Sequence, residues 1–193
     1  MTNLRAQDIL DFHDGRRPAG SASALWTAIG DNHRHNRLLW DEEDLARRKT
    51  VPDSEIAKNK RAIDGYNQKR NDAIERMDEQ LLILLSDVKQ KSNSRMNSET
   101  PGAMIDRLSI LSLKIHHMRL QTERTDVDRA HIDSCRAKLS RLDEQRTDLA
   151  ACLDGLLAEC ARGESYFKVY RQFKMYNDPA LNPAVYGESK RSS

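Results

Sequence analysis

Two adjacent stretches of this chain have the periodicity of amphipathic helices, but in both the apolar face is interrupted by polar side chains. In the first stretch, residues 22–48, the face runs through Leu25, Ile29, Asn32, Asn36, Trp40, Glu43 and Arg47. In the second, residues 54–88, the apolar positions share a face with Lys60, Asn67, Asn71 and Asp78. On a helix these positions fall within a sector of about 100°. Because a buried polar group left unpaired costs roughly 1–3 kcal/mol, such a face indicates a ligand site or a bonded structural network.

The composition favours a bundle of helices around one core. The chain has 193 residues, of which 32% are charged and 5% aromatic, with 8 glycines and 5 prolines, a balance typical of helices with solvated outer faces. The net charge of +2 gives no field that would recruit nucleic acid or a membrane surface. No apolar run is long enough to span a bilayer, and residues 1–11 lack the apolar segment of a signal peptide. With three cysteines that we interpret as free thiols, this predicts a cytoplasmic protein.

The periodicity predicts an all-α fold, an antiparallel bundle of four long helices with a short N-terminal helix. The expected helices span residues 4–12, 22–48, 54–91, 103–123 and 127–162. We interpret residues 1–187 as a single domain and residues 188–193 as a disordered tail.

Two features near the C-terminus carry specific expectations. Arg146 interrupts the apolar face of the last long helix, so it needs an acidic partner, solvent or a subunit interface; we expect a carboxylate from another helix. After Gly163 an aromatic stripe follows, and we expect Tyr166, Tyr170 and Phe173 to form a segment docked on the bundle.

The polar positions of the two interrupted helices are expected to meet. If the chain folds back at the turn around Pro52, residues of the two helices lie opposite each other where their numbers sum to about 103, to within about three residues. Asn36 then faces Asn67, and Glu43 faces Lys60. One shared cluster is therefore favoured over two separate surface patches.

The chemistry of such a cluster is that of a phosphorylated ligand with Mg²⁺ as its candidate cofactor. Glu43, Asp44 and Asp64 offer the oxygen ligands that Mg²⁺ prefers. Arg47, Lys60 and Arg70 suit phosphate, Asn36, Asn67 and Asn71 suit hydroxyls or a base, and Trp40 offers a stacking face. The alternative is structural: Glu43 with Lys60 as an interhelical ion pair, Trp40 as core, and the asparagines as determinants of helix register.

Three runs of residues resemble a bacterial family of all-helical cytosolic proteins of unknown function. They are Asn36-x-x-Leu39-Trp40-x-x-Glu43-Asp44-x-x-Arg47, Ile63-Asp64-x-x-Asn67-Gln68-x-Arg70-Asn71-Asp72 and residues 97–111, and the tail at residues 174–183 is also similar. The resemblance adds Asp106 to the candidate site. It also implies a setting, because genes of such proteins tend to lie near glycosyltransferases of envelope polysaccharide synthesis. The candidate ligand-binding residues are then Asn36, Trp40, Glu43, Asp44, Arg47, Lys60, Asp64, Asn67, Arg70, Asn71 and Asp106.

Three functions are consistent with these observations, and whether the protein is an enzyme stays open. The first is binding of a phosphorylated sugar or nucleotide in envelope glycan biosynthesis. The second is a non-catalytic interaction or scaffold protein, with a glycosyltransferase or a second copy of the chain as partner. The third is an all-α nucleotide pyrophosphohydrolase with carboxylates at Asp41–Asp44 and Glu75-x-x-Asp78. These two groups would lie roughly 27 Å apart along the hairpin, which argues against a shared metal.

Overall fold

The computed structural model describes residues 4–16, 23–171, 175, 178–184 and 186–187. Over these residues the chain is all-α, as expected, apart from two strands of two residues each. The elements are α1 (Ala6–His13), α2 (Ala24–Leu45), α3 (Asp53–Leu84), β1 (Arg95–Met96), α4 (Pro101–Thr122), α5 (Arg129–Ala161) and β2 (Ser165–Tyr166). Within the described part of the chain, no helix is both long and apolar enough to cross a membrane.

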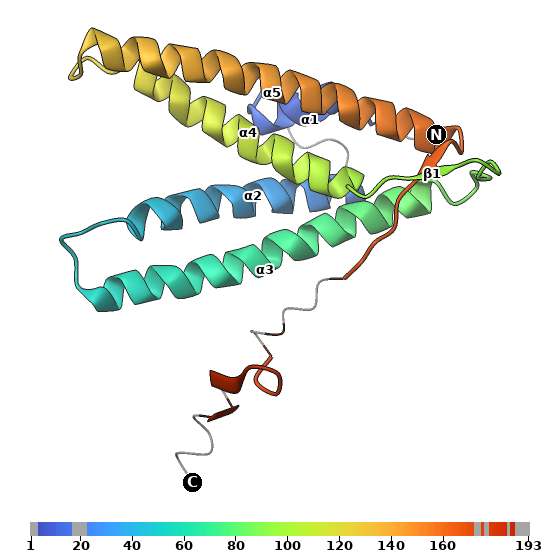
Figure 1. The fold of residues 1–193 in the computed structure, drawn as a ribbon, viewed down its shortest axis with the longest axis horizontal. Coiled ribbons are helices and arrows are strands. Elements are labelled where there is room, and N and C mark those ends of the chain that lie inside the picture. Colours follow the sequence, from blue (N-terminus) through green and yellow to red (C-terminus); the bar gives the residue numbers. More distant parts are fainter. Residues whose placement is uncertain (1–3, 17–22, 172–174, 176–177, 185, 188–193) are drawn as a thin grey trace.

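The four long helices form two hairpins, α2 with α3 and α4 with α5. Figure 1 shows both hairpins closing at the same end of the molecule, with the ribbons spreading apart toward that end. In the first hairpin Asn59 donates to Glu42 at 2.7 Å, and Arg76 donates to Asp31 at 2.9 Å. Both pairs lie within about one helical turn of the register expected from the sequence, so the expected fold-back of these two helices is confirmed.

Side-chain caps fix where three of the helices begin. The side chain of Ser23 accepts a hydrogen bond from the backbone of α2, Thr100 does the same for α4, and Asp128 for α5. Each cap satisfies a backbone N–H that has no partner within its own helix. At the other end of α5, Gly163 adopts a φ of +69° and ends the helix.

Helix α4 is the central element, because it packs against α1, α2, α3 and α5. Its side chains Ile105, Leu108 and Ile115 are almost fully buried. The first turn of α4 lies directly on α3, and Gly102 permits this approach. The Gly102 N–H donates to Asp78 at 2.6 Å, and a Cβ at Gly102 would lie 2.8 Å from the carbonyl oxygen of Ile74.

The end of α3 differs from expectation, because the helix stops at Leu84 and not near residue 91. The chain leaves the helix to pair with the segment after α5. The backbone of Lys91 donates to the carbonyl oxygen of Gly163, and β1 pairs in parallel with β2, with Arg95 opposite Ser165. Long-range backbone pairing replaces the last two turns of the expected helix.

The C-terminal segment docks through a different aromatic residue from those expected. Phe167 is 3% exposed and belongs to the main core, whereas Tyr170 is 74% exposed, so its expected docking is wrong. Tyr166 is partly buried in β2. Phe173 and the expected disordered tail at 188–193 lie outside the described residues.

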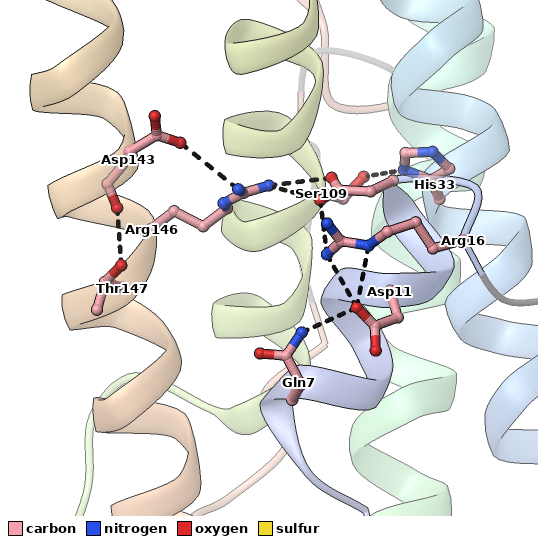
Figure 2. A network of polar contacts seen from close by, with 9 residues as sticks. Gln7, Asp11, Arg16, His33, Ser109, Asp143, Arg146 and Thr147 are labelled. Atoms are coloured by element: carbon pink, nitrogen blue, oxygen red, sulfur yellow. Dashed lines mark hydrogen bonds and ion pairs between the residues drawn. The ribbon is translucent and has the colours of Figure 1, made fainter.

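Arg146 meets its expected carboxylate partner. Its guanidinium group donates to both oxygens of Asp14, at 3.0 Å each, just beyond the end of α1. Figure 2 shows Arg146 reaching from α5 toward α1, where Arg16 bonds Asp11. This ion pair joins the end of the short first helix to α5 of the second hairpin.

Candidate functional site

A buried polar network joins α2 to α4 in the middle of the fold. The side-chain amides of Asn32 and Asn36 donate to one carboxylate oxygen of Asp106, at 2.8 and 2.9 Å. Asn36 also donates to Ser109 at 3.0 Å, and the Nδ1 atom of His33 lies 2.8 Å from the same hydroxyl. All five residues are buried. The two buried asparagines on the interrupted face of α2 are therefore satisfied by partners on α4, a helix that the sequence did not match with it.

Helix α3 approaches the same carboxylate through Arg70. The Nε atom of Arg70 lies 4.0 Å from an oxygen of Asp106, too far for a hydrogen bond. This Nε atom is buried and has no hydrogen-bond partner among the described residues. Such a donor is costly unless something accepts from it.

A cavity of about 300 Å³, here called the amide cavity, lies next to this network between α2, α3 and α4. Its lining residues are Asn36, Leu39, Trp40, Glu43, Asp44, Arg47, Asn67, Arg70, Ile110 and Leu113. Seven of the eleven residues expected from the sequence are in this set, namely Asn36, Trp40, Glu43, Asp44, Arg47, Asn67 and Arg70. The hairpin of α2 and α3 thus brings most of the expected cluster to one hollow.

The other four expected residues lie elsewhere. Asp106 belongs to the buried network next to the amide cavity. Lys60 and Asp64 form an ion pair of 2.6 Å on the exposed side of α3. Asn71 is buried and lines a separate cavity that also contains Asp78.

Two detailed expectations are corrected by these positions. Glu43 pairs with Arg47, just beyond the end of α2, at 2.8 Å, and not across the hairpin with Lys60. The expected Mg²⁺ ligands do not come together, because Asp64 lies outside the cavity that Glu43 and Asp44 line. Among the described residues, no group of three or more His, Cys, Asp or Glu side chains is placed to hold a metal ion.

A second and larger cavity of about 650 Å³, here called the basic cavity, shares Trp40 and Asp44 with the amide cavity. Its other lining residues are Lys114, His117, Met118, Gln121, Lys138, Arg141 and Leu142. The two cavities are therefore adjacent, and the second is formed between α2 and the α4–α5 hairpin. Sequence reasoning missed it because its cations come from helices that do not follow α2 directly.

Trp40 lines both cavities. Its indole ring stacks on the imidazole of His117, with centroids 4.3 Å apart and planes 7° from parallel. The Nε1 atom of Trp40 is buried and lacks a hydrogen-bond partner in the described part of the chain. Burial lowers the pKa of His117, with a further contribution from His116 beside it, so the stacked imidazole is neutral at pH 7.

The acidic pair proposed for a pyrophosphohydrolase is not assembled here. Asp78, on α3, lies against the first turn of α4 and accepts a hydrogen bond from the Gly102 N–H. Burial raises the pKa of Asp78 to about 6. The cavity that Asp78 and Glu75 line contains none of the carboxylates between Asp41 and Asp44. The structure thus separates the two acidic groups, as the hairpin register indicated.

Comparison with protein-family models gives a match over most of the chain. The family model described as "Protein of unknown function (DUF4254)" matches residues 26–169, which include the four long helices and both cavities almost entirely. Searches of the curated proteins and of the solved structures gave no significant match. Because the matched residues make up most of the sequence, this chain belongs to the DUF4254 family of proteins of unknown function.

Proposed function

We propose that this protein binds a phosphorylated sugar or nucleotide in the amide cavity. The observation that carries the proposal is Arg70, whose buried Nε–H lacks an acceptor while its side chain lines a cavity. A guanidinium group offers donors in a planar fork that matches phosphate oxygens. A bound phosphate would satisfy this arginine more fully than Asp106 does at 4.0 Å.

The neighbours of Arg70 suit the rest of such a ligand. The side-chain nitrogen of Asn36 donates to Asp106 and Ser109, and these bonds hold the side chain in place. Its amide oxygen can then accept a hydrogen bond from a ligand. Asn67 adds a second amide with both donors and an acceptor. Arg47 lies nearer the solvent and already pairs with Glu43, so it plays a secondary role in this proposal.

The proposed setting is the cytoplasm, with envelope glycan synthesis as the pathway that the family resemblance suggests. Mg²⁺ is the proposed accompanying ion for a diphosphate ligand. Glu43 and Asp44 line the cavity and could each offer it an oxygen.

Thermal unfolding with glucose 1-phosphate and with UDP, each with and without Mg²⁺, tests the proposal. A ligand at 100 times its dissociation constant stabilises the fold by about 2.7 kcal/mol. Arg70→Lys keeps the charge but removes the fork, and we expect it to abolish most of that stabilisation. Lys58→Ala, on the exposed surface of α3, is the control. The absence of any shift with the unmodified protein would refute the proposal.

A second candidate, a non-catalytic interaction protein, is favoured by an exposed apolar run at the end of α3. Leu82, Ile83 and Leu84 are 39%, 63% and 51% exposed. Consecutive exposed aliphatic residues mark contact surfaces in soluble proteins. If this run binds a glycosyltransferase or a second copy of the chain, Ile83→Asp should abolish co-purification or dimerisation without lowering the melting temperature.

A further inference from the structure

We propose that the ligand is a nucleoside diphosphate sugar that lies across both cavities, with its base stacked on Trp40 in the place now taken by His117. This inference rests on the proposed function, because it keeps the sugar phosphate in the amide cavity. It adds a second half of the ligand, in the basic cavity, and thereby a class of substrate.

The volumes of the two cavities support a ligand of two parts. The amide cavity, at about 300 Å³, lies at the lower limit of small-molecule sites, whereas the basic cavity holds about 650 Å³. A sugar phosphate would occupy the smaller space and leave the larger one to solvent. Because Trp40 and Asp44 line both cavities, the cavities are adjacent, and the proposed ligand extends from one to the other past these two side chains.

The stack between Trp40 and His117 shows that the indole accepts a flat ring. The imidazole lies 4.3 Å away and within 7° of parallel, as a nucleobase would. Base stacking on an aromatic side chain contributes strongly and tolerates every base. His117 forms no ion pair with the described residues, so moving its ring out of the stack would break no ion pair among them. A ligand acceptor would also satisfy the buried Nε1 atom of Trp40.

The charges on either side of Trp40 suit a diphosphate at the boundary. Lys114, Lys138 and Arg141 line the basic cavity, and Arg47 and Arg70 line the amide cavity. Arg141 is partly engaged, because it lies 3.5 Å from Glu144. Among the described residues, Asp44 is the one acidic side chain that lines the basic cavity, and Mg²⁺ would offset its repulsion of a diphosphate.

The test uses the fluorescence of Trp40. The chain has two tryptophans, so Trp26→Phe leaves Trp40 as the single reporter. Binding of UDP-glucose, GDP-mannose and glucose 1-phosphate is measured by calorimetry, and fluorescence is followed in parallel, with Mg²⁺ in the buffer. We expect at least one nucleotide sugar to bind about tenfold more tightly than glucose 1-phosphate and to quench Trp40, whereas glucose 1-phosphate binds without quenching.

A charge reversal localises the second half of the ligand. We expect Lys138→Glu to remove most of the preference for the nucleotide sugar over glucose 1-phosphate. Lys58→Glu makes the same change in charge on α3, outside both cavities, and should preserve the preference.

The outcomes separate this inference from the proposed function. If glucose 1-phosphate binds as tightly as both nucleotide sugars, or if neither nucleotide sugar quenches Trp40, the two-cavity ligand is overturned while the amide cavity keeps its proposed role. If none of the three probes binds, the proposed function fails and this inference fails with it.

Discussion

Acidification should destabilise this protein through one buried histidine, His33. Its ring lies against the Ser109 hydroxyl and stacks on the ring of His13, with centroids 4.6 Å apart. Burial, with a further contribution from Arg37, lowers the pKa of His33 to about 4. The pKa of His13 is also lowered, by burial and by the charges of His33 and Arg146. The imidazole of His33 is therefore mostly neutral in the folded protein at pH 5.

The magnitude follows from the difference between the folded and unfolded pKa values. In the unfolded chain the pKa of a histidine is about 6.5, so His33 takes up a proton below that pH only when the protein unfolds. A folded pKa that is depressed contributes stability above pH 6.5 that is lost progressively as the pH falls toward 4. At pH 5 the loss from His33 is about 2 kcal/mol, at 1.36 kcal/mol for each pH unit of separation. His13 adds to this loss.

Asp78 opposes this trend. Burial raises its pKa to about 6, so the folded protein holds a proton that the unfolded chain releases above about pH 4. Lowering the pH from 7 to 5 therefore stabilises the fold by about 1 kcal/mol through this group. The unmodified protein combines both effects, and single substitutions separate them.

Urea unfolding at pH 7, 6 and 5 is the assay. We expect His33→Asn, whose amide can still bond Ser109, to reduce the loss of stability between pH 7 and 5 by about 2 kcal/mol relative to the unmodified protein. Asp78→Asn should instead increase that loss by about 1 kcal/mol. Ala57→Ser, on the exposed surface of α3, changes no titratable group and is the control. An unchanged profile in His33→Asn would refute the reasoning.

Three further predictions follow from the packing. Gly102→Ala places a Cβ 2.8 Å from a backbone oxygen of α3 and should lower the melting temperature, whereas Gly155→Ala, with nothing within 4 Å, should raise stability by about 1 kcal/mol. Asp106→Ala removes the acceptor of two buried amides on α2 and should cost about 2–6 kcal/mol in urea unfolding. Phe167→Ala should cost about 3–5 kcal/mol, and Tyr170→Ala less than about 0.5 kcal/mol; equal losses would contradict the described docking of the tail.

Periodicity and turn chemistry were sufficient to predict the helices and the α2–α3 hairpin. The polar positions on α2 and α3 follow directly from a period of 3.6 residues and a short turn, which is why most of the amide cavity could be anticipated. Side-chain pairing was less predictable. Glu43 has a closer partner, Arg47, four residues along the chain and just beyond the end of α2, and local ion pairs of this kind form without any constraint from the tertiary fold.

Contacts between the two hairpins could not be predicted from the sequence. The pairing of Asn32 and Asn36 with Asp106 depends on how the second hairpin packs on the first, and no turn geometry fixes that. The same applies to Lys114 and Lys138 beside Trp40. The polar face of α2 predicted that partners exist, and the tertiary fold alone determines which residues they are.

The parallel pairing of β1 with β2 has a consequence for how the chain folds. Each helical hairpin is made of contacts that are local in sequence, and local contacts close quickly. Arg95 and Ser165, by contrast, are separated by the whole of the second hairpin and can meet only after it has formed. The pairing then joins the loop before α4 to the segment after α5, so that α4 and α5 lie within a closed non-covalent ring. Hydrogen exchange should find the amides of Arg95 and Asn97, which this pairing protects, among the last to gain protection during refolding.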